Sequence, residues 1–206
     1  MKKGMTILYK VHDNLYVNLT NKCPCACTFC LRQNMDTVSR VDDRPLWLEH
    51  EPSYEEIIAD FANYDMSEYK EVVFCGYGEP TERLDVLLKV ASYVKENFTN
   101  KVRINTNGMA NLIWDRDTTP EFEGLVDTIS ISLNNPDPVK YHEIVRCKFG
   151  EKSFDEMLKF AHDVKKYVPA VVLTTVETTI SKEEEQQCAK ICEDLGVTYR
   201  IRAWEG

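Results

Sequence analysis

Short runs of apolar residues recur along the chain, and polar or turn-forming residues frame each run. Between Asn14 and Thr20 the side chains of Leu15, Val17 and Leu19 alternate with their neighbours, which predicts a strand with one buried face. Further runs rich in β-branched and aromatic residues predict five more strands. The six expected strands are 14–20, 71–75, 101–106, 127–133, 170–176 and 197–202.

Segments with a helical pattern separate these strands. Ser53 is followed three residues later by Glu56, a reciprocal capping pattern in which each side chain satisfies a free backbone donor at a helix start. The same spacing recurs at Ser153 and at Ser181. The expected helices are 53–64, 82–97, 136–146, 154–167 and 182–195, with a further helical crossover within 109–124.

The alternation of strands and helices predicts an α/β fold with a parallel sheet and right-handed crossovers. Two architectures satisfy this pattern, an open doubly wound sheet and a curved partial barrel, and the pattern alone does not separate them. A length of 206 residues with 43% hydrophobic content suits one sizeable core. We therefore expect residues 1–206 to form a single domain.

Charge and the N-terminal residues restrict the partners. A formal net charge of −9 argues against nucleic acid and anionic membranes, which would require a basic face. In the first ten residues the consecutive apolar run is only Ile7, Leu8 and Tyr9, too short for a signal peptide or a membrane span. We expect a soluble, cytoplasmic protein.

A cysteine-rich segment directly follows the first expected strand. Cys23, Cys27 and Cys30 form a Cys-x3-Cys-x2-Cys pattern, with Cys25 inside the first gap. Three thiolates on one loop can bind three irons of a [4Fe–4S] cluster and leave the fourth iron without a protein ligand. The alternative is a structural zinc site, which usually takes two separated Cys-x2-Cys pairs, and the sequence has no second pair. The remaining cysteines are scattered, so we expect one cluster.

With Phe29 directly before the last cysteine, this segment resembles the signature of the radical S-adenosylmethionine (SAM) superfamily. The resemblance implies a [4Fe–4S] cluster and SAM as cofactors. It also implies a partial (β/α)6 barrel, with a curved, parallel, six-stranded sheet and outer helices. The segments Asn-Leu-Thr-Asn at 18–21 and Cys-Gly-Tyr-Gly-Glu-Pro-Thr at 75–81 resemble, more narrowly, the small TatD-associated radical SAM subgroup.

The resemblance also implies positions that contact SAM. Gly78, Glu79 and Pro80, after an inserted Tyr77, are similar to the family's Gly-Gly-Glu-Pro segment, which binds the amino group of SAM. Without the resemblance, this segment reads equally well as a tight turn before a helix.

Further SAM contacts are implied along the chain. The positions are Phe29, Asn107, Ser132, Asn134, Arg146, Glu177 and Ile201. Arg146 matches the arginine that pairs with the SAM carboxylate, a role that suits a planar guanidinium. The segment Arg200 to Arg202, with Ile201 at its centre, would offer backbone groups to adenine. Asn107 belongs to a Thr-Asn-Gly turn that we interpret as mainly structural.

Most of these candidates fall at the carboxyl end of an expected strand. In parallel β/α proteins this edge carries ligands and chemistry, so independent motifs converge on one face. The convergence supports one shared site.

The resemblance implies reductive cleavage of SAM to a 5′-deoxyadenosyl radical, which abstracts hydrogen from an unidentified substrate. The electron would come from a donor such as flavodoxin or ferredoxin. One alternative is a glycyl-radical-type activase acting on a partner protein that covers the open side of the barrel. An alternative of another class is a non-catalytic metal-binding scaffold module.

Overall fold

A computed structural model describes residues 4–32, 40–41 and 44–203 of the chain. The strands are β1 (Leu8–Val11), β2 (Asn14–Val17), β3 (Arg40–Val41), β4 (Arg44–Pro45), β5 (Glu71–Phe74), β6 (Lys101–Thr106), β7 (Thr128–Ser132), β8 (Ala170–Val176) and β9 (Thr198–Arg202). The α-helices are α1 (Tyr54–Phe61), α2 (Leu84–Asn97), α3 (Ala110–Trp114), α4 (Pro138–Val145), α5 (Lys152–Val164) and α6 (Lys182–Leu195). The 3-10 helices are η1 (Met66–Glu68), η2 (Pro80–Arg83) and η3 (Thr119–Phe122).

Seven strands form one sheet in the order β1-β2-β5-β6-β7-β8-β9, and β3 pairs with β4 separately. From β2 to β9 all neighbours are parallel and follow one another in chain order. A doubly wound sheet would reverse its order at a switch point, so the order identifies the partial barrel. The six expected strands are confirmed, with ends that differ by up to three residues.

The seventh strand, β1, is absent from the sequence prediction. It pairs antiparallel with β2, from Leu8 opposite Val17 to Val11 opposite Asn14. The two-residue turn between these strands has His12 at a φ of 51°. Two-residue hairpin turns usually contain glycine or asparagine, and this one lacks that signal.

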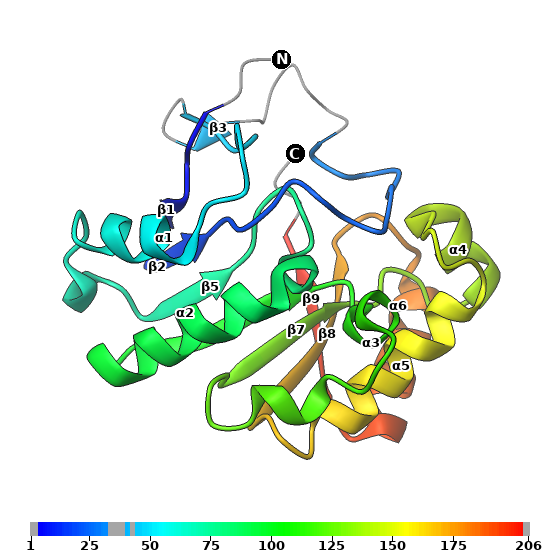
Figure 1. Cartoon of the computed structure of the whole chain (residues 1–206). Helices are drawn as coiled ribbons and strands as arrows, with labels where there is room; N and C mark the ends of the chain where they lie inside the picture. Colours follow the sequence, from blue (N-terminus) through cyan, green and yellow to red (C-terminus); the bar gives the residue numbers. More distant parts are fainter. Residues whose placement is uncertain (1–3, 33–39, 42–43, 204–206) are drawn as a thin grey trace.

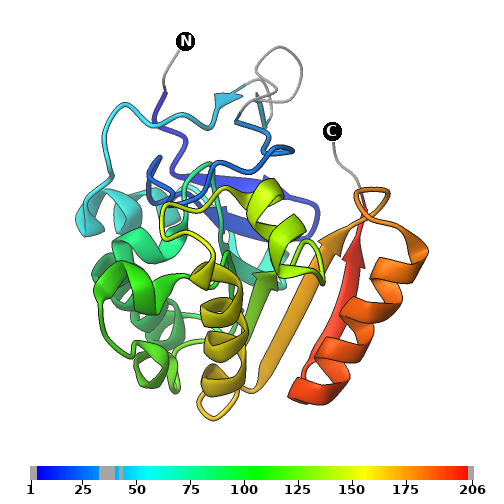
Figure 2. The same cartoon turned by 90° about the vertical axis from the view of Figure 1, so that its right-hand side faces the viewer.

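The helices α1, α2, α3, α5 and α6 pack around the outer face of the sheet (Figures 1 and 2). The outward residues of the central strands, such as Val102, Ile104 and Ile131, are fully buried in the main core. No helix among residues 4–32, 40–41 and 44–203 is long and apolar enough to cross a membrane.

Two of the three expected capping boxes are present. Ser53 and Ser181 each accept a hydrogen bond from the backbone of the glutamate three residues later, which returns one to the serine backbone. The box expected at Ser153 is wrong, because α5 begins at Lys152 and the Ser153 side chain is fully buried inside its first turn.

Candidate active site

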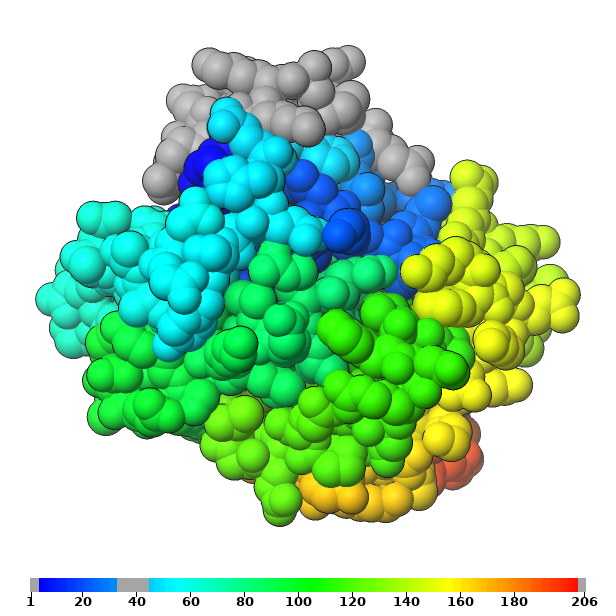
Figure 3. All heavy atoms as spheres, viewed as in Figure 1, coloured from blue at the N-terminus to red at the C-terminus, as the bar shows by residue number. Residues whose placement is uncertain are grey.

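The cysteine loop follows β2 and lies above the carboxyl ends of the strands. Its first residues are attached to the segment before α1, since the Asn21 side chain donates to the Leu48 carbonyl (2.8 Å) and accepts from the Leu48 backbone nitrogen (3.1 Å). In Figure 3 the blue loop lies between the cyan surface of that segment and the yellow surface near α4. The loop therefore bridges distant parts of the chain.

The second half of the loop is attached to the end of α4. The backbone nitrogen of Ala26 donates to the Val145 carbonyl (3.1 Å), and that of Lys148 donates to the Pro24 carbonyl (2.8 Å). These bonds fix the backbone on both sides of Cys25.

A cavity of about 180 Å³ lies below the loop. Eight of the residues expected from the sequence line it: Cys23, Cys27, Phe29, Gly78, Glu79, Asn107, Ser132 and Asn134. They come from the loops after β2, β5 and β6 and from the end of β7, so the motifs do meet at the carboxyl edge of the sheet.

The donor set fits a cluster. All eight cysteines are free thiols, and Cys23, Cys27 and Cys30 are partly exposed. Burial raises the pKa of the Cys27 thiol to about 12, and charge on the nearby Cys23 and Cys30 adds to the rise. A bound iron cluster would hold these cysteines as thiolates, because cysteine binds iron in its deprotonated form.

A single metal ion fits the same thiols less well. In the described part of the chain, no three His, Cys, Asp or Glu side chains come together as ligands of one ion. The three cysteines of a cubane cluster each bind a different iron, so their sulfur atoms need not converge on one point.

Asn107 connects the loop after β6 to the cysteines. Its side-chain nitrogen lies 3.8 Å from Sγ of Cys23 and 3.5 Å from Sγ of Cys25, within reach of weak hydrogen bonds to sulfur. Hydrogen bonds to cluster-bound sulfur are one determinant of reduction potential. In addition to its expected structural role, Asn107 therefore contacts the cysteine thiols directly.

Glu79 is almost fully buried and is held by four hydrogen bonds. Its Oε1 accepts from the backbone nitrogen (3.1 Å) and hydroxyl (2.8 Å) of Thr81 and from the Thr106 hydroxyl (2.6 Å). Its Oε2 accepts from the backbone nitrogen of Asn107 (2.7 Å). Burial raises the pKa of the carboxyl group, and these donors oppose the rise. Glu79 thus ties the loops after β5 and β6 together.

We expect Glu79→Gln to lower the free energy of unfolding by about 2 kcal/mol, because the amide would turn a donor towards groups that already donate. Urea unfolding followed by circular dichroism measures the change. Glu123→Gln, at an exposed glutamate, is the matched control. Equal stability of the two variants would contradict the structural role of Glu79.

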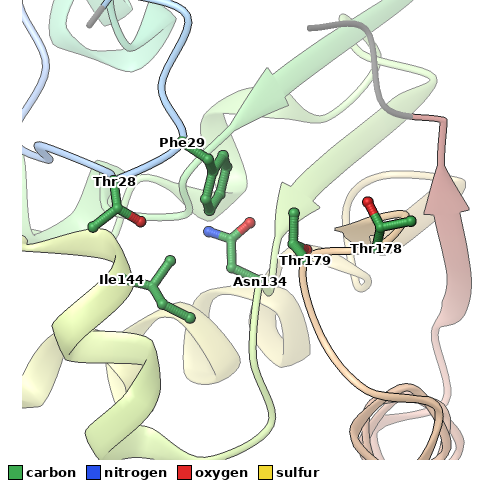
Figure 4. Close-up of a pocket in the computed structure, with 6 residues that line it drawn as sticks. All are labelled: Thr28, Phe29, Asn134, Ile144, Thr178 and Thr179. Atoms are coloured by element: carbon green, nitrogen blue, oxygen red, sulfur yellow. The ribbon is translucent and has the colours of Figure 1, made fainter.

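A second cavity, of about 290 Å³, opens beside the first. Figure 4 shows the Phe29 ring directed from the cysteine loop towards the Asn134 amide, with Ile144 beside them. Asn134 has a φ of 62° and is only 5% exposed, and its Oδ1 has no hydrogen-bond partner. A strained residue with an unpaired buried acceptor indicates a place where a ligand donor binds. These residues fit SAM.

The other expected site residues lie elsewhere. Those that do not line the cysteine-lined cavity are Cys30, Tyr77, Pro80, Arg146, Glu177 and Ile201. Arg146 is exposed at the end of α4, where its side chain donates to the Glu143 carbonyl. Glu177 is also exposed. Their roles stay predictions.

Tyr77, Pro80 and Ile201 have identifiable surroundings. Tyr77 is 6% exposed and packs edge-on against Trp47, with ring centroids 5.2 Å apart. Pro80 begins η2, in agreement with the turn interpretation of this segment. Ile201 is 40% exposed on β9 and pairs through its backbone with Thr175.

Several cavity residues are absent from the sequence prediction. They include Cys25, Cys75, Asn105, Ser130 and Thr174. Arg202, expected only to offer backbone groups to adenine, also lines the cavity. Asn105, Ser130, Thr174 and Arg202 are polar residues near the carboxyl ends of strands, on the face opposite the buried apolar side chains. The period-two alternation within each strand was the signal that could have identified them.

A parallel, barrel-like sheet with cysteine thiols at its carboxyl edge defines a class of β/α protein with a candidate metal centre. The sequence profile described as Radical SAM superfamily matches residues 17–195, and the chain belongs to that family. Members of the family are enzymes that use a [4Fe–4S] cluster and SAM, which are therefore the cofactors of this chain. Among curated proteins, no sequence matches the chain.

Solved structures share the fold. SuiB of Streptococcus suis, bound to the precursor peptide SuiA, has a TM-score of 0.64 and 16% identity, over 96% of this chain and 40% of SuiB. A radical SAM methyltransferase from Sphaerobacter thermophilus has a TM-score of 0.65 and 13% identity, over 97% of this chain and 69% of the methyltransferase. Methylornithine synthase (PylB) has a TM-score of 0.65 and 15% identity, over 92% of this chain and 52% of the synthase. The chain thus spans less than half of SuiB.

Proposed function

We propose that this radical SAM enzyme binds its cluster through Cys23, Cys27 and Cys30 and abstracts hydrogen from an unidentified substrate. The observation that carries the proposal is the meeting of the Cys23 and Cys27 thiols with Glu79, Ser132 and other family-matched residues around one cavity. When bound, the cluster and SAM supply a 5′-deoxyadenosyl radical.

The residues of the chain hold and shield these cofactors. Asn107 donates towards thiol sulfur, and Asn134 offers an unpaired acceptor to SAM. Phe29 and Ile144 supply apolar walls beside Asn134. Arg146 would pair with the SAM carboxylate only if its exposed side chain turned away from the end of α4.

The test is anaerobic reconstitution with iron and sulfide, then reduction by dithionite with SAM. We expect about four irons per chain and formation of 5′-deoxyadenosine, measured by chromatography. Protein that has not been reconstituted is the control. A non-catalytic scaffold would give no 5′-deoxyadenosine, and about eight irons would show a second cluster.

The second candidate function is action on a partner protein that covers the open side of the barrel. In the described sheet β1 and β9 stand at opposite ends and do not pair, so the barrel is open. SuiB, which shares the fold, was solved with a precursor peptide. These observations support an activase or peptide-modifying role as the alternative.

The finer expectations rest on sequence segments. The TatD-associated subgroup depends on the segments at 18–21 and 75–81 alone, since the family match reaches only the superfamily. A flavodoxin or ferredoxin is proposed as the electron donor from the family resemblance alone. A cytoplasmic location agrees with eight cysteines free of disulfides, which a reducing compartment preserves.

A further inference from the structure

A cavity of about 500 Å³ occupies the inner face of the sheet, beside the cysteine-lined cavity. Residues of β1, β2, β6 and β9 and the segment after β5 line it. The two cavities share Cys75, Gly76, Asn105 and Arg202 as a common wall. A molecule in the larger cavity would therefore face the site of radical formation.

Three arginines line this cavity. Arg103 of β6 and Arg200 and Arg202 of β9 point inward, since alternate residues of a strand face opposite sides and Val102 and Ile104 pack outward. The protein as a whole is acidic, with a net charge of −9. A concentration of positive charge inside its barrel is thus not a consequence of composition.

The positive charges are only partly compensated. Arg103 is 9% exposed and pairs with Glu71 (3.1 Å), yet its Nε has no hydrogen-bond partner. Nε of Arg202 is also buried without a partner. Arg200 donates to the Ser130 hydroxyl (3.2 Å). Among the described residues, no carboxylate lies within ion-pair distance of Arg200 or Arg202.

The arginines also repel one another. Partial desolvation lowers the pKa of Arg200, and the positive charges of Arg103 and Arg202 lower it further, while the charge of Glu71 opposes the shift. Arg103 is buried and Arg202 half-buried, whereas Arg200 is exposed. The Nε atoms of Arg103 and Arg202 lack the acceptor that a buried guanidinium nitrogen normally has. An anion is the ligand that would satisfy both the charge and the donors.

Aromatic side chains supply another wall. Tyr9 and Tyr16 pack with ring centroids 5.3 Å apart, and Tyr77 lines the same cavity. The Tyr9 hydroxyl donates to the Cys75 carbonyl (3.0 Å), which fixes the ring beside the common wall. These rings offer an apolar surface to the body of a bound molecule.

We propose that the substrate is a small molecule with an oxyanion group, a carboxylate or phosphate, that Arg103, Arg200 and Arg202 bind. Its apolar or planar body lies against Tyr9, Tyr16 and Tyr77, and its reactive carbon faces Cys75. The volume of about 500 Å³ is in the range of small-molecule sites. This inference rests on the proposed function for the identity of the reaction.

Calorimetric titration of the cluster-loaded protein, with SAM present, tests the site. The probes are succinate and inorganic phosphate, and glycerol is the uncharged control. We expect one oxyanion to bind and glycerol not to bind. The stronger probe distinguishes carboxylate from phosphate.

Arg200→Gln should weaken binding of the oxyanion at least tenfold, because a charge-assisted hydrogen bond is lost. Arg116→Gln, at an arginine outside the cavity, should bind like the unaltered protein. Arg103→Gln gives a second test, and a thermal melt confirms that each variant is folded.

Absence of oxyanion binding, or equal binding by Arg200→Gln, would overturn the inference. Competition between SAM and the oxyanion would also overturn it, since the arginines would then serve SAM. The 5′-deoxyadenosine assay reports the proposed function separately. Arginine-dependent binding without that product would refute the radical enzyme and retain the anion site.

Discussion

Replacing Cys27 by alanine is expected to remove the cluster and all reductive cleavage of SAM. The Cys27 thiol lies in the wall of the cavity together with that of Cys23, and Cys30 follows three residues later on the same loop. A cluster bound by three cysteines has no spare protein ligand, so two remaining thiolates would not retain it. Iron content after anaerobic reconstitution, the visible absorption and the yield of 5′-deoxyadenosine measure the loss.

Two further alanine variants control this experiment. Cys25→Ala removes a thiol from the same loop, and Cys192→Ala removes a buried thiol from α6. Both should keep about four irons. Retention of the cluster in Cys27→Ala, together with its loss in Cys25→Ala, would show that Cys25 is a ligand in place of Cys27.

Gly78→Ala should destabilise the protein and prevent cluster assembly. A Cβ atom at Gly78 would lie 2.3 Å from the carbonyl oxygen of Thr20 and 2.6 Å from that of Lys22. Both oxygens belong to the backbone at the start of the cysteine loop, so no side-chain rotation relieves the collision. We expect a loss of about 3 kcal/mol in the free energy of unfolding.

Urea unfolding and iron content measure these two effects. Gly124→Ala is the matched control, because its Cβ would have nothing within 4 Å and only its φ of 72° is unfavourable. That variant should lose about 1 kcal/mol and retain the cluster. An intact cluster in Gly78→Ala would contradict the close contact between the two loops.

The strands were predictable because their signals are local. Runs such as 101–106 and 170–176 contain enough β-branched residues to specify a strand without tertiary information. The first run matches β6 and the second matches β8. β1 was not predicted, because it has only four residues, an atypical turn joins it to β2, and its strand conformation depends on pairing with β2. The helix cap predicted at Ser153 was wrong, because serine occurs both at helix caps and at buried positions such as this one.

The site was predictable where a motif carried it, as at Cys23 and Glu79. The grouping of the arginine side chains around the inner cavity was not predictable, since it depends on which face of each strand turns inward. Arg103 and Arg200 are almost a hundred residues apart in the sequence, and only the sheet places them around one cavity. The position of Arg146 depends on the conformation of a helix end, which sequence pattern does not determine.

The bonds between the cysteine loop and the end of α4 also constrain biosynthesis. Ala26 and Val145 are about 120 residues apart along the chain, so the ribosome releases the thiols well before the segment that orients them. Until α4 emerges, the second half of the nascent loop lacks the hydrogen bonds that fix its backbone beside Cys25. Iron and sulfide should therefore be delivered to a completed chain, and a stalled fragment that ends before Pro138 should be unable to retain them.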